Sequence, residues 1–146
     1  MPGPRPPGTS VLDGVAALSG TERLGGRHPG VNTPNPSTLI VHWNGQALIR
    51  VPSPGPGSLD GVAVTSARNA WAVGSYGTGG DHYATLIVHW NGAAWQRVPS
   101  PRNPFPGHGD GLGGVAAVGD HAAWAVGYAA GGGAGWIVQW NGTAWK

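Results

Sequence analysis

The chain has 146 residues, which suits one domain, and 40% of them are hydrophobic, which is enough for a core. Only 10% are charged and the formal net charge is +2, with seven Arg and one Lys scattered along the chain, so no basic cluster predicts nucleic-acid binding. The absence of Cys excludes disulfides, thiolate metal sites and thiol catalysis, and the absence of an 18-residue apolar run excludes a predicted membrane helix.

Three related units follow a Pro/Gly-rich segment at residues 1–10. The phrase TLIVHWNG occurs at 38–45 and 85–92, and a third version, IVQWNG, ends at Gly142. We place the units at residues 11–54, 58–101 and 111–146. A period of 40–50 residues is typical of a propeller, a solenoid or an array. The N-terminal segment has no apolar stretch, so we expect no secretion signal and leave the localisation open.

The first unit is degenerate. Leu24 stands where the other units carry Trp71 and Trp124, and Leu48 stands where they carry Trp95 and Trp145. Its residues 23–37, RLGGRHPGVNTPNPS, are rich in Gly and Pro and predict a poor second strand. We therefore expect this unit to be loosened or remodelled.

The second unit shows the pattern most clearly. Four strand candidates are separated by turns, and no window has a helical period; they lie at 61–66, 69–76, 84–90 and 93–99. Four antiparallel strands in a unit of this length form a propeller blade. Pro99 near the end of the fourth strand predicts an outer edge, because proline cannot donate to a ladder. The small first strand then suits the crowded centre.

Asn-Gly ends the third strand of each unit, at 44–45, 91–92 and 141–142. This dipeptide predicts a two-residue type I′ hairpin, which would place Trp90 opposite Ala93 and Val88 opposite Trp95. One face of the sheet would then carry Leu86, Val88, Trp90 and Trp95. The other face would carry Ile87, His89, Gln96 and Val98.

These residues resemble a kelch-type repeat. Trp71-Ala72-Val73-Gly74 takes the place of the aromatic second strand that ends in Gly, Trp90-Asn91 that of the third strand, and Trp95 that of the fourth-strand Trp. The paired glycines of that family are reduced here to the single Gly74 and Gly127. The resemblance covers the chain from residue 11 and implies an all-β propeller, while it is almost silent on function.

Three blades do not close a ring, because propellers close with about four to eight blades. Two chains supply six blades, so we predict a head-to-tail homodimer. The third unit stops at Trp145-Lys146 with its outer strand truncated, and segment 1–10 resembles the missing tail, so it could complete a blade of another protomer. The alternative is that the chain is a piece of a longer propeller.

The tryptophans on the outer hairpins are the first candidate site. Trp90, Trp95, Trp140 and Trp145 fit inter-blade core, and alternatively they form an aromatic platform for a sugar ring. His42, His89 and Gln139 occupy equivalent positions, and a Gln in place of His favours a hydrogen-bonding role over a base or metal ligand. Asp13 and Asp60 lie just before the predicted first strands, where they favour turn hydrogen bonds or line the central mouth.

No enzymatic pattern stands out. The remaining histidines lack the short spacing of a zinc site, and no Ser, His and Asp follow a hydrolase order, so we predict no catalytic residues, metal or cofactor. The kelch family includes a copper radical oxidase with a Tyr–Cys cofactor, which a chain without Cys cannot form. We predict a non-enzymatic binding or scaffolding module that assembles with itself. Glycans or another protein are further possible partners, and the alternatives are a multivalent lectin and an open-ended fibre.

Overall fold

The computed structural model describes residues 10–19, 22–29, 38–44, 46–80, 82–101, 109–129 and 134–146. Side chains are described from Thr38 onward, Ala134 excepted. Segment 1–10, apart from Ser10, lies outside the described residues. No helix in the described part of the chain is long and apolar enough to span a membrane.

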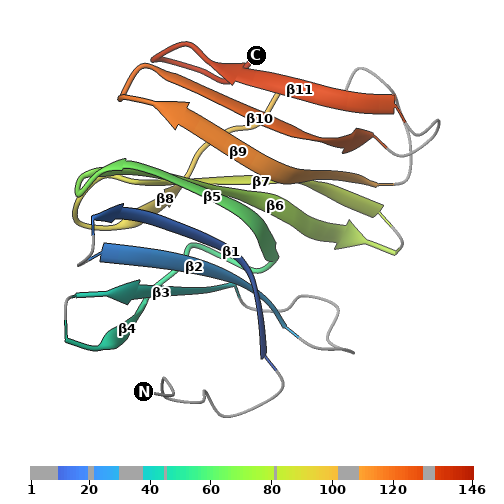
Figure 1. Cartoon of the computed structure of the whole chain (residues 1–146). Helices are drawn as coiled ribbons and strands as arrows, with labels where there is room; N and C mark the ends of the chain where they lie inside the picture. Colours follow the sequence, from blue (N-terminus) through green and yellow to red (C-terminus); the bar gives the residue numbers. More distant parts are fainter. Residues whose placement is uncertain are drawn as a thin grey trace.

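Three antiparallel sheets, which we call blades 1, 2 and 3, are stacked in chain order (Figure 1). Blade 1 contains β1 (Ser10–Ser19), β2 (Glu22–Pro29), β3 (Leu39–Trp43) and β4 (Leu48–Val51). Blade 2 contains β5 (Ser58–Ser66), β6 (Asn69–Gly79), β7 (His82–Trp90) and β8 (Trp95–Arg97). Blade 3 contains β9 (Asp110–Val118), β10 (Ala122–Ala129) and β11 (Ala134–Trp140). The all-β fold predicted from the repeat is confirmed.

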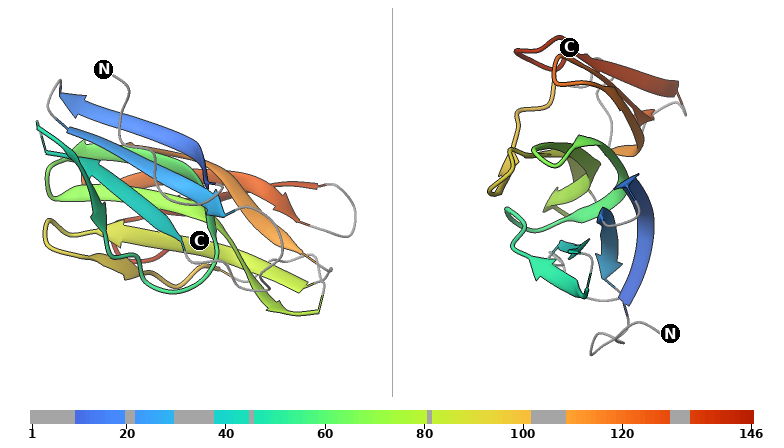
Figure 2. Two further views of the ribbon diagram at one scale, coloured as in Figure 1. Left: turned by 90° about the horizontal axis from the view of Figure 1, so that it is seen from below. Right: turned by 60° about the vertical axis from the view of Figure 1, so that its left-hand side comes forward.

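The strands of blades 1 and 2 are arranged in chain order, so β4 and β8 form the outer edges (Figure 2). In blade 3 the start of a fourth strand is present, because Trp145 bridges to Trp140 and Lys146 exchanges two backbone hydrogen bonds with Gln139, at 2.8 and 2.9 Å. The first strand lies at the other edge, where β5 adjoins both β1 and β9. A Cβ on Gly61 of β5 would lie 3.0 Å from the Cα of Gly114 in β9, so only small residues fit there.

Of the segment 23–37, which was predicted to be a poor second strand, residues 23–29 lie in strand β2, and residues 30–37 lie outside the described residues. Strand β2 pairs with β1 along its length and with β3 from Arg23 to Arg27. Hydrogen bonding on both sides therefore outweighs the low strand propensity of a Gly-rich segment.

The predicted two-residue hairpin is wrong. Trp90 pairs with Trp95 and His89 with Gln96, so the connection has four residues, 91–94. The Asn91 side chain determines this length, because its Oδ1 accepts hydrogen bonds from the backbone N–H groups of Ala93 and Ala94, both at 3.0 Å. The register moves by two residues, and an even shift keeps every side chain on its predicted face.

The first strands contain a β-bulge, and they begin earlier than predicted, so that the two aspartates expected just before them lie inside them. Asp13 and Asp60 lie within β1 and β5, at register shifts between Leu12 and Gly14 and between Leu59 and Gly61. Blade 3 has the same shift, since Gly114 pairs with Val126 and Leu112 pairs with Gly127. A bulge leaves one residue unpaired and bends its strand, and its position coincides with the Leu-Asp-Gly phrase that occurs at 12–14 and 59–61.

The bulge also explains the final glycine of the phrase AWAVG, which occurs at 70–74 and 123–127. A Cβ on Gly74 would lie 2.0 Å from the carbonyl oxygen of Ser58, and a Cβ on Gly127 would lie 1.9 Å from that of Gly111. These distances are far below van der Waals contact, so no other residue fits without backbone movement.

The core lies between blades as two apolar layers. The layer between blades 1 and 2 contains Ile40, Leu59, Ala70, Ala72, Leu86, Val88 and Trp95. The layer between blades 2 and 3 contains Trp71, Val73, Ile87, Leu112, Ala123, Ala125, Val138 and Trp145. Blade 2 is therefore covered on both faces, and each layer depends on the next blade in the stack.

Candidate functional site

The predicted tryptophans form cross-strand pairs at the outer hairpins. Trp90 lies opposite Trp95 with ring centroids 5.8 Å apart, and Trp140 lies opposite Trp145 at 6.0 Å. Trp95 and Trp145 are only 5% exposed, so their ring faces are used in packing. The indole N–H groups of Trp90 and Trp140 donate to the carbonyl oxygens of Ala67 and Asp120, at 3.0 and 3.4 Å. These contacts attach the outer hairpin to the turn between the first two strands.

Trp71, which the site prediction left out, is the centre of an aromatic cluster between blades 2 and 3. Its ring centroid lies 5.0 Å from that of Trp140 and 5.1 Å from that of Trp145, the latter in edge-to-face geometry. The ring of His89 lies 4.2 Å away on the same blade. One tryptophan of a blade therefore packs against the tryptophan pair of the following blade.

His89 takes part in a polar network within this layer. Its Nε2 lies 2.6 Å from Oδ1 of Asn69, and Nδ2 of Asn69 donates to Oγ1 of Thr65 at 2.6 Å and to the carbonyl oxygen of Gly119 at 3.0 Å. Burial lowers the pKa of His89, and the negative charge of Asp120 opposes that shift. This network connects blade 2 to blade 3 through Asn69.

The other predicted polar residues lie apart from this network. His42 is partly buried in blade 1, and Gln139 is exposed on blade 3. Asp60 is partly buried at its bulge, while the side chain of Asp13 is not among those described. His42, His89 and Gln139 are therefore spread over the three blades, one in each, and Asp13 and Asp60 lie in blades 1 and 2. Within the described residues, no three His, Asp or Glu side chains form a group that could hold a metal ion.

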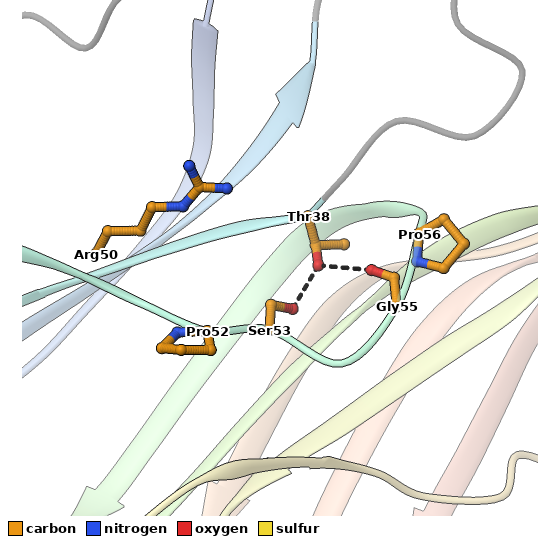
Figure 3. Close-up of a pocket in the computed structure, with 6 residues that line it drawn as sticks. All are labelled: Thr38, Arg50, Pro52, Ser53, Gly55 and Pro56. Atoms are coloured by element: carbon orange, nitrogen blue, oxygen red, sulfur yellow. Dashed lines mark hydrogen bonds between the residues drawn. The ribbon is translucent and has the colours of Figure 1, made fainter.

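A cavity of about 600 Å³ lies beside the outer strand of blade 1 and is lined by Thr38, Arg50, Pro52, Ser53, Gly55 and Pro56 (Figure 3). The hydroxyl of Thr38 donates to the carbonyl oxygen of Gly55 at 3.1 Å and is also hydrogen bonded to the hydroxyl of Ser53. The Ser53 hydroxyl then donates to Thr38, so both protons are used. Arg50 is the one charged residue among these six.

An apolar surface is exposed on the face of blade 3 that is directed away from blade 2, which we call the outer face of blade 3. Among the described residues eight large hydrophobic side chains are exposed, and five of them lie on this face: Val118, Trp124, Val126, Tyr128 and Ile137. Contiguous apolar patches of this kind mark interaction sites. The sequence carried a signal for this face, because Trp124 stands where Trp71 stands in the unit before it.

No protein-family model matches the chain, and no curated protein matches it. Solved structures do match, and one of them is YCF48 bound to D1 peptide, with 12% sequence identity and a TM-score of 0.55. The similarity covers 97% of this chain and 43% of that one, so this chain spans less than half the length of its structural neighbour. That neighbour is a β-propeller. With its own stack of two four-stranded antiparallel sheets and one three-stranded antiparallel sheet, the chain has a propeller-type fold.

Proposed function

We propose that the chain is a non-enzymatic binding or scaffolding module, and that its three blades are half of a six-bladed ring completed by a second copy. The propeller-type fold supports the general role, since propellers present loops and a central channel on a rigid frame. We also propose that the repeat is kelch-like, on the strength of Trp71, Gly74 and Trp95 at their places in the blade.

One observation carries the self-assembly. Three residues on the face of blade 2 that meets blade 3 are almost fully buried because blade 3 covers them: Trp71, Val73 and Ile87 are 1%, 0% and 0% exposed. Their equivalents on blade 3, Trp124, Val126 and Ile137, are 39%, 48% and 67% exposed. The same apolar set therefore occurs twice, once covered by a blade and once not. A following blade is the surface that this set is known to fit.

A ring of two copies would cover the exposed faces at both ends of each stack. The outer face of blade 3 in each copy would meet blade 1 of the other, giving two identical contacts related by a two-fold axis. Such head-to-tail contacts close when the rotation between neighbours fits and otherwise form filaments. Closure at six blades lies within the range that propellers use.

The polar and aromatic candidates support a structural use rather than catalysis. His89 is bound to Asn69, and Trp95 and Trp145 lie in the inter-blade layers. The lectin alternative stays a prediction, with Trp90 and Trp140 as its remaining rings, and the burial of their pair partners does not favour it.

The test is the mass of the full chain in solution, measured by light scattering over a wide range of protein concentration. We expect a species of two protomers. A species of one protomer at every concentration would refute self-assembly, and a broad distribution of heavy species would replace the closed ring with the fibre alternative.

A further inference from the structure

The aromatic contact between blades 2 and 3 is a template for the contact that a second copy of the chain would make. The Trp71 ring of blade 2 packs on the Trp140 and Trp145 pair of blade 3, with centroids 5.0 and 5.1 Å away. That pair is a cross-strand pair at the start of the outer hairpin. Blade 3 therefore shows how a tryptophan of one blade is received by the blade that follows it.

Blade 1 carries a cross-strand pair at the corresponding position, on the face directed away from blade 2. Trp43 lies directly opposite Leu48, as Trp90 lies opposite Trp95 in blade 2. Side chains of this parity face away from blade 2, because Ile40, of the opposite parity, is the blade 1 residue in the shared layer. Trp43 is partly buried and Leu48 is 39% exposed, so the pair is accessible on the described surface.

Blade 3 carries the matching tryptophan. Trp124 has the position of Trp71 in its blade, since it pairs with Gln139 as Trp71 pairs with His89. It lies between the strand neighbours Ala116 and Gln139 on the face that also exposes Val126 and Ile137. The two ends of the stack therefore present the two halves of the contact that joins blades 2 and 3.

We propose that Trp124 of one copy docks on the Trp43–Leu48 pair of a second copy, and this inference rests on the proposed function. The exposed face of blade 3 matches the face of blade 2 that blade 3 covers, so the partner that covers it is blade 1 of a second copy of this chain. Leu48 stands where Trp145 stands in the internal contact, so the joint between copies has less aromatic area than the joint within one copy. The contact between copies is therefore the weaker of the two.

Substitutions at these positions test the pairing in the full chain. Trp124→Glu and Leu48→Lys each place a charge in the proposed contact, and we expect the dissociation constant of the dimer to rise by about 30-fold or more, as for removal of an interface hot spot. Leu48→Trp gives blade 1 a tryptophan pair like the Trp140–Trp145 pair of blade 3, and we expect it to lower the dissociation constant. Tyr83→Ser is the control, because Tyr83 is 53% exposed in the central blade, away from both ends of the stack. Circular dichroism verifies that each variant is folded.

Mixing the two charged variants gives a second readout. A heterodimer of Trp124→Glu and Leu48→Lys copies has one unaltered contact and one Glu–Lys contact, so we expect the mixture to recover dimers that neither variant forms by itself. If the unaltered chain does not associate, the proposed function fails. If it associates and both charged variants associate equally well, the assembly stands and the Trp124 pairing is wrong.

Discussion

Asn69 of blade 2 donates a hydrogen bond from Nδ2 to the carbonyl oxygen of Gly119 in blade 3, at 3.0 Å. It also accepts at Oδ1 from His89, so a single buried amide connects the outer half of one blade to the inner turn of the next. Blade 3 has Ala122 at the equivalent position, so this polar connection belongs to the joint between blades 2 and 3.

Replacing Asn69 by Ala should destabilise the fold by about 1–3 kcal/mol, because His89 and the Gly119 carbonyl would lose their partner in a buried place. The free energy of unfolding in urea measures the effect. Thr78→Ala is the control, since the Thr78 hydroxyl donates to the His82 carbonyl at an exposed site, and we expect a change below about 0.5 kcal/mol. Equal losses in the two variants would contradict a buried connection.

The lowered pKa of His89 makes stability depend on pH. Burial favours the neutral imidazole in the folded chain, so the unfolded chain binds the proton more readily. The stability due to this group is complete above the unfolded value of 6.5 and is lost as pH falls from there through the lowered folded value. Urea unfolding at several pH values should show a decline below 6.5 that is smaller in His89→Gln. His121→Gln is the control, and an unchanged decline in His89→Gln would contradict this cause.

The close approach at the bulge predicts a severe effect of one methyl group. Gly74→Ala and Gly127→Ala each place a Cβ about 2 Å from a backbone oxygen, and we expect a loss of at least about 2 kcal/mol in the free energy of unfolding. Gly113→Ala is the matched control, because a Cβ there would meet no atom within 4 Å. A loss at Gly113 as large as at Gly127 would show that the contact distance is not the cause.

The asparagine turns predict a difference between two substitutions. Asn91→Ala removes the acceptor of two backbone N–H groups and should cost about 1 kcal/mol, whereas Asn91→Asp keeps an acceptor and should cost less. Thermal unfolding of the two variants measures the difference. The same order is expected at Asn141, which accepts from Thr143 and Ala144 at 3.0 and 2.9 Å. Equal melting temperatures for Ala and Asp would refute the role of the acceptor.

Much of the fold followed from the sequence. The repeat located the blades, and strand periodicity assigned Leu86, Val88, Trp90 and Trp95 to one face, an assignment that survived the error in the hairpin register. It survived because side chains alternate with a period of two and the register was displaced by two residues. The edge position of the fourth strand was also predicted correctly, from Pro99, because proline has no N–H to donate to a neighbouring strand.

The tertiary structure decided the features that depend on contacts between distant segments. The Asn91 side chain lengthened the turn by binding two amides, and pairing on both sides made β2 a strand despite its glycines. The bulge at Asp60 became visible only through its register against β6. By itself the sequence determined which residues each blade presents on its two faces, because that depends on local alternation. Only the stack decided that Trp71 is buried and Trp124 is exposed, because burial depends on whether another blade lies against the face.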